Sequence, residues 1–147
     1  MRAVKSFVFL ALKFAPALKQ ITVVSEMADP LGPDLGVAVE DSGVTCEVTN
    51  DLQTVLSDLD AIYMNSIALL GDTYKKLDSR YKVTADSPLK PNTVLMHPLA
   101  RREELDPSLD QTRHNLYFAQ AYGAVYVRQA LLTAILGRLD RLPFLAP

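Results

Sequence analysis

The stretch from Ile21-Thr-Val-Val24 to Val44-Thr-Cys-Glu-Val48 decides the fold class. Both ends are short apolar runs typical of buried strands, and residues 31–42 between them carry apolar side chains at helical spacing. Gly43 follows this helical segment as a helix-stop residue. A strand, a helix and a second strand in this order are the repeating unit of a parallel sheet, because parallel neighbours need a long crossover connection.

The same alternation continues toward the carboxyl end. The further predicted elements are strands at 60–64 and 92–97 and helices at 52–59, in part at 74–81, and at 115–139. The prediction is an α/β fold: a single three-layer domain with a parallel sheet of about four to five strands, helices on both faces and a long C-terminal helix. The domain is expected to cover residues 1–141, with residues 142–147 as a tail.

The composition is that of an ordinary globular protein, and it excludes some classes of function. The chain has 147 residues, with 15 Lys and Arg against 17 Asp and Glu, a net charge of −2 and 49% hydrophobic residues. This length suits one domain with one core. The mildly acidic charge lacks the clustered cations of a nucleic-acid-binding protein, so no nucleic-acid partner is expected. The single Cys46 is expected to pack in the core and indicates a reducing, cytoplasmic setting.

Residues 1–17 superficially resemble a signal peptide, with a basic start, an apolar run and an Ala-Pro-Ala ending. The uninterrupted apolar run, residues 6–12, is at the short limit for such a segment, and Lys13 and Lys19 follow it. The apolar spacing instead predicts an amphipathic first helix that ends before Pro16. No membrane partner is expected.

Polar residues follow the end of the predicted strand at 92–97. The segment that contains them is Val94-Leu-Met-His-Pro-Leu-Ala-Arg-Arg-Glu-Glu-Leu105. His97 could serve as a general acid or base, and Arg101 or Arg102 could hold a carboxylate or phosphate. The alternative is that His97 packs at a strand end while residues 101–104 form a solvated charged face. Neither a metal-ligand spacing nor a glycine-rich phosphate loop is present, so no metal or cofactor is expected.

Several motifs occur in a characteristic order: residues 2–7, 60–64, 94–101, 106–110, 117–121 and 127–132. Together they resemble the C-terminal, aspartate-binding half of the aspartate carbamoyltransferases, which carry a His-Pro-Leu-Pro-Arg loop, an acidic segment, a Tyr-Phe-x-Gln-Ala helix start and an Arg-x-Ala-Leu-Leu run. The resemblance extends over nearly the whole chain.

The resemblance implies a set of substrate-binding remnants: Arg2, His97, Pro98, Leu99 and Arg101. It also implies three lost positions, since Ser66 and Ala68 stand where the family has the Arg and Gln that bind aspartate, and Ala100 replaces the second proline of the loop. A short hydroxyl replaces neither the reach nor the charge of a guanidinium. The family's carbamoyl-phosphate domain has no counterpart here, so no catalytic residue is assigned.

These departures favour a pseudoenzyme: a non-catalytic structural or regulatory subunit of a pyrimidine-biosynthesis enzyme. The expected partner is a full-length carbamoyltransferase, another enzyme of that pathway, or further copies of the chain. The alternative is one half of a split carbamoyltransferase, which would complete an active site with a separate carbamoyl-phosphate domain and transfer the carbamoyl group to an amino-acid amine. A third reading is a piece of a longer enzyme.

Overall fold

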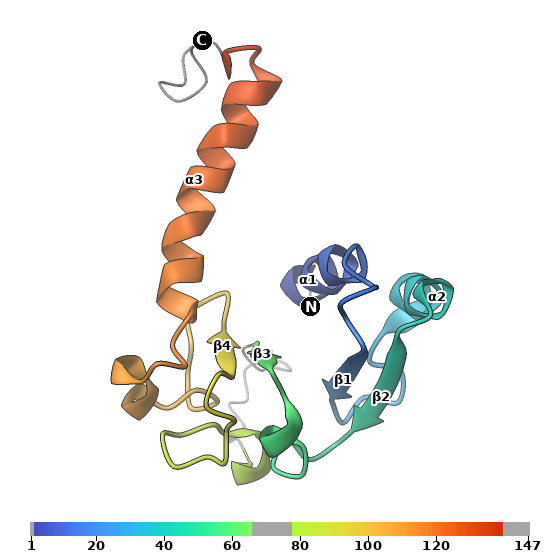
Figure 1. The fold of residues 1–147 in the computed structure, drawn as a ribbon, viewed down its shortest axis with the longest axis vertical. Coiled ribbons are helices and arrows are strands. Elements are labelled where there is room, and N and C mark those ends of the chain that lie inside the picture. The colour runs from blue at the N-terminus through green and yellow to red at the C-terminus, as the bar shows by residue number, and fades with distance from the viewer. Residues whose placement is uncertain (1, 66–77, 140–147) are drawn as a thin grey trace, which may run out of the picture.

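The computed structural model describes residues 2–65 and 78–139. Figure 1 shows the chain as two small strand pairs, a pair of helices beside one of them, and a long helix that extends away from the other. The helices and strands are α1 (Arg2–Leu12), β1 (Gln20–Val24), α2 (Gly32–Ser42), β2 (Thr45–Thr49), β3 (Ala61–Tyr63), β4 (Val94–Met96) and α3 (Tyr117–Ile135). The described residues also include three short 3-10 turns: η1 (Leu56–Asp58), η2 (Ser79–Tyr81) and η3 (Pro107–Gln111).

The four strands form two parallel pairs, β1 with β2 and β3 with β4. Gln20 lies opposite Thr45 in the first pair, and Ala61 lies opposite Val94 in the second. The α/β class, the parallel pairing and the long C-terminal helix are confirmed. The structure differs from the expected continuous sheet, because no strand pairing joins β1 to β3 within residues 2–65 and 78–139.

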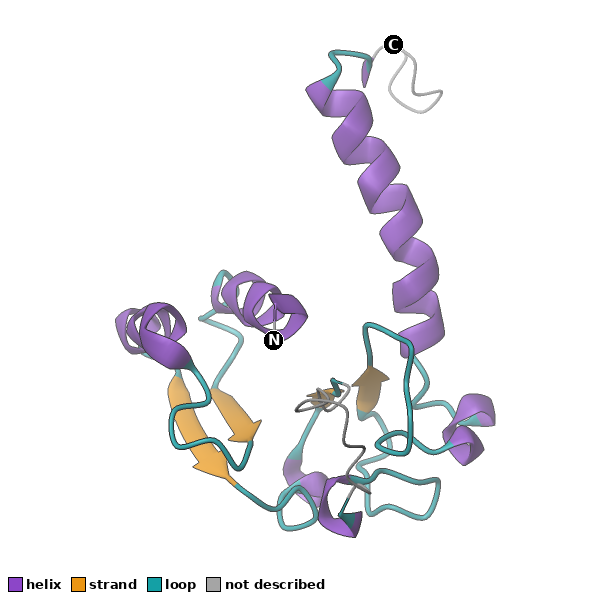
Figure 2. Cartoon of the chain, turned by 180° about the vertical axis from the view of Figure 1, so that it is seen from behind, coloured by secondary structure: helices purple, strands orange, loops and turns teal. Residues whose placement is uncertain are grey.

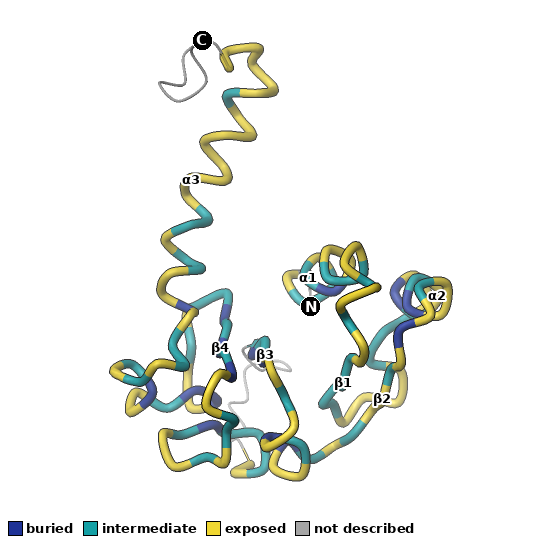
Figure 3. The backbone as a smooth tube through the Cα atoms, in the orientation of Figure 1, coloured by how far each residue is buried: buried dark blue, intermediate teal, exposed yellow. Residues whose placement is uncertain are grey.

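The layers also differ from the predicted three-layer arrangement. Viewed from behind in Figure 2, α1 and α2 lie together beside the β1–β2 pair, and α3 leaves the β3–β4 pair at one end. α3 therefore covers little of either pair, because most of its length has no neighbour among the described residues (Figure 3).

The predicted helix at 52–59 is wrong beyond a single turn, the 3-10 segment η1. Leu52 and Leu56 do face the core, as the apolar spacing indicates. The backbone bonds of this segment, however, span three residues, from the N–H of Val55 to the carbonyl of Leu52 and from the N–H of Asp58 to the carbonyl of Val55, as in turns and 3-10 helices. Of the helical segment expected at 74–81, only residues 78–81 are described, and Ser79–Tyr81 among them form η2.

Glycine and proline determine where α1 and α2 begin and end. α2 starts at Gly32 with Pro33 in its first turn, where the missing N–H of proline has no helical partner in any case. It ends at Gly43, which has a left-handed φ of 71° and donates its N–H to the carbonyl of Glu40. α1 ends at Leu12, ahead of Pro16, as expected.

The apolar core is divided into two clusters, one for each strand pair. The larger surrounds β3 and β4 and contains Leu52, Leu56, Ile62, Met64, Val83, Leu95, Leu105, Leu109 and Tyr117. The smaller is built on α1 and α2 from Val8, Leu35 and Val39, with Ile21 and Cys46 packed against it. Cys46 is thus half-buried, and this burial, together with the charge of Glu47, raises the pKa of its thiol.

One aromatic pair connects α1 to β3. The rings of Phe7 and Tyr63 stack with centroids 4.4 Å apart. We expect a coupling energy of about 1 kcal/mol between these residues, in addition to the area they bury. A double-mutant cycle with Phe7→Leu and Tyr63→Leu, followed by urea unfolding, measures it. The same cycle with Phe9→Leu, on the exposed side of α1, should give a coupling near zero, and equal couplings would contradict the prediction.

The long helix α3 is apolar around most of its circumference and is exposed over most of its length. Phe118, Tyr122, Val125, Tyr126, Leu132 and Ile135 are among its exposed side chains. Neither α3 nor any other helix in the described part of the chain is long and apolar enough to cross a membrane.

Candidate functional site

The segment that follows β4 folds back against its own strand. The N–H of Leu95 donates to the carbonyl of His114 at 2.8 Å, and the N–H of Leu116 donates to the carbonyl of Leu95 at 3.0 Å. These two bonds occupy the edge of β4 that faces away from β3. They also fix the start of α3, so that Gln120 accepts the backbone N–H of His97 at 3.0 Å. The loop at 97–105 is therefore held between β4 and the first turn of α3.

His97 and Glu104 form a fully buried pair at the base of this loop. Nε2 of His97 lies 2.9 Å from Oε1 of Glu104, and both side chains are almost completely shielded from solvent. The backbone N–H of Leu99 donates to Nδ1 of His97 at 2.8 Å. Because Nδ1 is an acceptor, this hydrogen-bond network assigns the ring proton to Nε2, which donates it to Glu104. The same carboxylate oxygen accepts the N–H of Arg102 at 2.9 Å.

The loop has an unusual backbone where it turns. Leu99 has a positive φ of 55°, and the Leu99–Ala100 peptide bond is cis. Ala100 occupies this position in place of the second proline that the family pattern has. The hydrogen bond from Leu99 to the His97 ring spans the turn.

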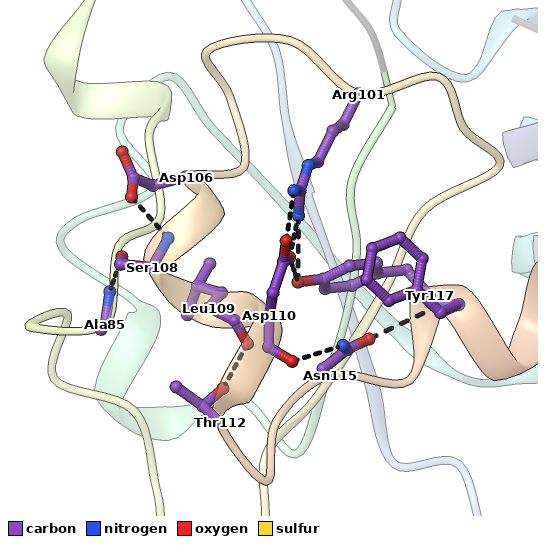
Figure 4. A network of polar contacts seen from close by, with 10 residues as sticks. Ala85, Arg101, Asp106, Ser108, Leu109, Asp110, Thr112, Asn115 and Tyr117 are labelled. Atoms are coloured by element: carbon purple, nitrogen blue, oxygen red, sulfur yellow. Dashed lines mark hydrogen bonds and ion pairs between the residues drawn. The ribbon is translucent and has the colours of Figure 1, made fainter.

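Arg101 is bound by an acidic side chain of its own chain. Its guanidinium makes two parallel hydrogen bonds to the carboxylate of Asp110, of which the one from Nη2 to Oδ2 is 2.7 Å long (Figure 4). Nη1 also donates to the hydroxyl of Tyr117 at 3.1 Å, and this hydroxyl donates to Asp110. The planar fork that could hold a ligand carboxylate is thus already occupied by an internal one.

The electrostatics follow from this network. Hydrogen bonds from Arg101, and then from Tyr117, lower the pKa of Asp110 to about 2. Burial, and then the hydrogen bond to Asp110, raises the pKa of Tyr117 to about 12. The hydrogen bonds to Asp110 raise the pKa of Arg101. All three groups therefore keep their usual charge states at neutral pH, with Arg101 and Asp110 ionised.

The lowered pKa of Asp110 predicts a specific acid dependence of stability. The ordinary pKa of an aspartate is 3.8, and the pKa of Asp110 in the folded protein is about 2. The contribution of the ionised Asp110 to the free energy of unfolding is therefore fully present above pH 3.8 and is lost as the pH falls toward 2. About a quarter of the Asp110 side chain is exposed, so we expect a modest contribution of about 1 kcal/mol. Urea unfolding should show a difference in the free energy of unfolding between the wild type and Asp110→Asn that becomes smaller as the pH is lowered from 3.8 toward about 2. A difference that stays constant with pH would contradict the lowered pKa of Asp110.

The structure places some of the predicted site residues together and leaves others apart. His97, Pro98, Leu99, Ala100 and Arg101 lie on one loop, as expected. Arg2 is the first residue of α1. Ser66 and Ala68 lie outside the described residues.

The solvated charged face proposed for residues 101–104 is wrong in part. Glu104 is buried and hydrogen-bonded to His97, and Arg101 is hydrogen-bonded to Asp110. Sequence reasoning missed Glu104, Asp110 and Tyr117 as partners, although the last two lie in motifs that carry the family resemblance. In the described residues, no group of three His, Cys, Asp or Glu side chains is placed to hold a metal ion.

Comparisons with known proteins match most of the chain to one family. The sequence model described as aspartate/ornithine carbamoyltransferase, Asp/Orn binding domain, matches residues 2–135. The chain belongs to this family. It is 36% identical over 106 residues to an aspartate carbamoyltransferase catalytic subunit from Haloquadratum walsbyi, a match that covers 68% of this chain and 35% of that protein. A catalytic subunit from Methanosarcina acetivorans is 28% identical over 127 residues, with 82% and 41% covered.

Solved structures show the same carbamoyltransferase fold. The aspartate transcarbamoylase of Trypanosoma cruzi in complex with carbamoyl aspartate and phosphate superposes with a TM-score of 0.72 at 24% identity, covering 89% of this chain and 42% of that one. A putative aspartate carbamoyltransferase from Leishmania major gives a TM-score of 0.69 at 22% identity, with 90% and 45% covered. The chain thus spans less than half the length of these carbamoyltransferases.

Proposed function

We propose that this chain is an aspartate-carbamoyltransferase-type domain that works as a non-catalytic structural or regulatory subunit of a pyrimidine-biosynthesis enzyme. One observation carries the proposal: the polar groups of the family's substrate loop are satisfied inside the chain. The His97 ring bonds to Glu104 and to the backbone of Leu99, and the Arg101 fork bonds to Asp110.

Because the Arg101 guanidinium is already paired with Asp110, we expect the chain to lack affinity for aspartate. A ligand carboxylate would have to displace Asp110, and it would leave that carboxylate without its bidentate partner. It would also break the bond between Arg101 and the buried Tyr117 hydroxyl. Ser66 and Ala68 replace the further Arg and Gln of the family pattern, so no other cation is expected to compensate.

The exposed helix α3 supports association with another protein. Apolar and aromatic side chains run along it, and such surfaces in a soluble domain are typical of interfaces. A full-length carbamoyltransferase is the partner that we propose first. Another enzyme of the pathway, or a second copy of the chain, would use the same surface.

The test separates catalysis from association. Sedimentation velocity would be recorded for the chain mixed with a recombinant aspartate carbamoyltransferase catalytic subunit. Carbamoyl aspartate formation would be followed for the chain alone. We expect a complex that is lost in Leu132→Asp on α3 but retained in Val37→Asp, which places the same charge at an exposed apolar residue of α2. We expect no turnover by the isolated chain. Turnover by the chain alone, or the absence of both hetero- and self-association, would contradict the proposal.

A split carbamoyltransferase remains the second candidate, because the loop keeps the His-Pro-Leu sequence and the arginine, Arg101, of the family pattern. In that case the loop would orient an amino-acid acceptor while a separate domain holds carbamoyl phosphate. A mixture of the chain with an isolated carbamoyl-phosphate domain of a relative would then form a carbamoyl amino acid. No product with any of the twenty common amino acids would eliminate this candidate.

A further inference from the structure

α1 and α2 belong to two segments of opposite charge. Residues 1–25 contain four Lys and Arg residues and no Asp or Glu, whereas residues 26–65 contain nine Asp and Glu residues and no Lys or Arg. α1 lies in the first of these segments and α2 in the second. The charges of the chain are therefore separated between two neighbouring helices, although its net charge is only −2.

α1 and α2 lie side by side and run in the same direction. Figure 1 and Figure 2 both show them next to each other on one side of the β1–β2 pair. Each helix leads into one strand of this parallel pair, and their inner faces share the smaller apolar cluster, which contains Val8 and Leu35. Nζ of Lys5, in the first half of α1, lies 3.5 Å from the position that a Cβ on Gly32 would take, at the start of α2. The outer faces of the two helices therefore lie along the same side of the molecule.

The outer stripe of α1 has a cation at each end and an aromatic residue in the middle. Lys5, Phe9 and Lys13 follow one another at intervals of four residues, so they share one face of the helix. Lys13 directly follows α1 and continues its winding, because its N–H donates to the carbonyl of Leu10 at 3.0 Å. Phe9 is 40% exposed, and Lys13 is exposed as well. We call these three residues the cationic stripe.

The outer stripe of α2 is the acidic counterpart. Asp34, Val37 and Asp41 follow at intervals of three and four residues, which again places them on one face. Val37 is 57% exposed, and both aspartates are exposed. Within residues 2–65 and 78–139, neither these aspartates nor Lys13 forms an ion pair. This acidic stripe thus has the same order of charged, apolar and charged residues as the cationic stripe, with the opposite sign.

We propose that the outer face of α1 and α2 binds the same face of a second copy of the chain, about a two-fold axis parallel to the helices. Such an axis places α1 of each copy on α2 of the other. Because the two helices run in the same direction, it brings Lys13 of each copy to Asp41 of the other. Phe9 and Val37 would meet in the middle and bury their exposed apolar surface. The contact is complementary in both charge and apolar character.

The size of this face sets the expected strength of the dimer. Each helix has 11 residues and is about 16 Å long, and two helices side by side are about 20 Å wide. Such a face is smaller than the roughly 800 Å² per partner of a standard interface. We therefore expect a weak dimer that salt weakens further, because its charged residues lie at the surface. The proposal does not rest on the subunit association through α3, which uses a different surface.

The test uses the full chain with Leu132→Asp, which removes association through α3. Sedimentation velocity would be recorded up to about 1 mM protein, in about 0.02 M and about 0.3 M salt. We expect a dimer at low salt whose dissociation constant rises about tenfold or more at high salt. Val37→Asp, which leaves association through α3 intact, should abolish this dimer. Circular dichroism confirms that each variant folds.

Charge reversals test the location of the contact. Lys13→Glu alone and Asp41→Lys alone should each weaken the dimer by about tenfold, because each places like charges opposite one another. An equimolar mixture of these two variants should restore it, because the reversed residue of one copy then meets the reversed residue of the other. Arg138→Glu and Asp86→Lys make the same charge changes at exposed positions outside this face. Each control should leave the dissociation constant within about twofold of its starting value.

Three results would overturn the proposal. The first is a monomer at every concentration at low salt, which would leave this face to a different partner. The second is a dimer that Lys13→Glu and Asp41→Lys weaken no more than the two control reversals do. The third is an equimolar mixture that dimerises as weakly as the separate variants. None of these outcomes depends on whether the chain binds a carbamoyltransferase through α3, because every sample carries Leu132→Asp.

Discussion

Glu104→Ala is expected to lower the free energy of unfolding by about 3 kcal/mol, whereas Glu103→Ala, at the next position, lowers it by less than about 1 kcal/mol. Glu104 is buried, and one of its carboxylate oxygens accepts both the Nε2–H of His97 and the N–H of Arg102. Its removal leaves two donors without this acceptor, and each unsatisfied buried group costs about 1–3 kcal/mol. Glu103 pairs with Lys82 at the surface, where such pairs contribute little.

A third variant separates the role of the acceptor oxygen from that of the charge. Glu104→Gln keeps an oxygen in place for both donors, so its cost should be about 1 kcal/mol. Urea unfolding at neutral pH measures all three variants. Similar costs for Glu103→Ala and Glu104→Ala would show that the His97–Glu104 pair does not hold the loop. A small cost for Glu104→Ala would also reopen a chemical role for His97.

The elements that could be predicted from the sequence are those fixed by local pattern. The β1–α2–β2 unit follows from two apolar runs around a helical segment, and Gly43 marks the helix end because it adopts a left-handed φ there. The division into two strand pairs could not be predicted, because strand pairing depends on which edges meet in space. The helix expected at 52–59 is only one turn long in the structure, in a segment that bonds to distant Arg80 and Lys82 through Leu52 and Gln53. Apolar spacing alone does not predict such contacts.

The site was predictable in part. A histidine at the end of a strand, followed by proline, correctly indicated a structured loop at 97–101. The run Arg-Arg-Glu-Glu at 101–104 looks uniformly solvated in the sequence, although Glu104 is buried and Glu103 is exposed. The partner of Arg101 lies nine residues further on, in the short 3-10 segment η3, and no helical or strand period predicts a contact between the two.

Asp110→Ala is expected to lower the free energy of unfolding by about 2–3 kcal/mol. The variant leaves the Arg101 guanidinium without its bidentate partner and the buried Tyr117 hydroxyl without its acceptor. The Asn115 side chain donates to the backbone carbonyl of Asp110 and not to its carboxylate, so this hydrogen bond should survive the change (Figure 4). Asp86→Ala, at an exposed position, serves as the control and should change the stability by less than about 0.5 kcal/mol.

The same variant tests why the loop does not bind a substrate carboxylate. Asp110→Ala releases the Arg101 fork, which remains partly exposed beside the rings of Tyr117 and Phe118. If the internal pair is what blocks the loop, calorimetry should detect weak binding of aspartate or another dicarboxylate to Asp110→Ala and none to the wild type. The double variant Arg101→Ala/Asp110→Ala should bind nothing, because it lacks the cation. Binding of aspartate by the wild type would show instead that Asp110 yields to the ligand, and it would favour the split-enzyme candidate over a non-catalytic subunit.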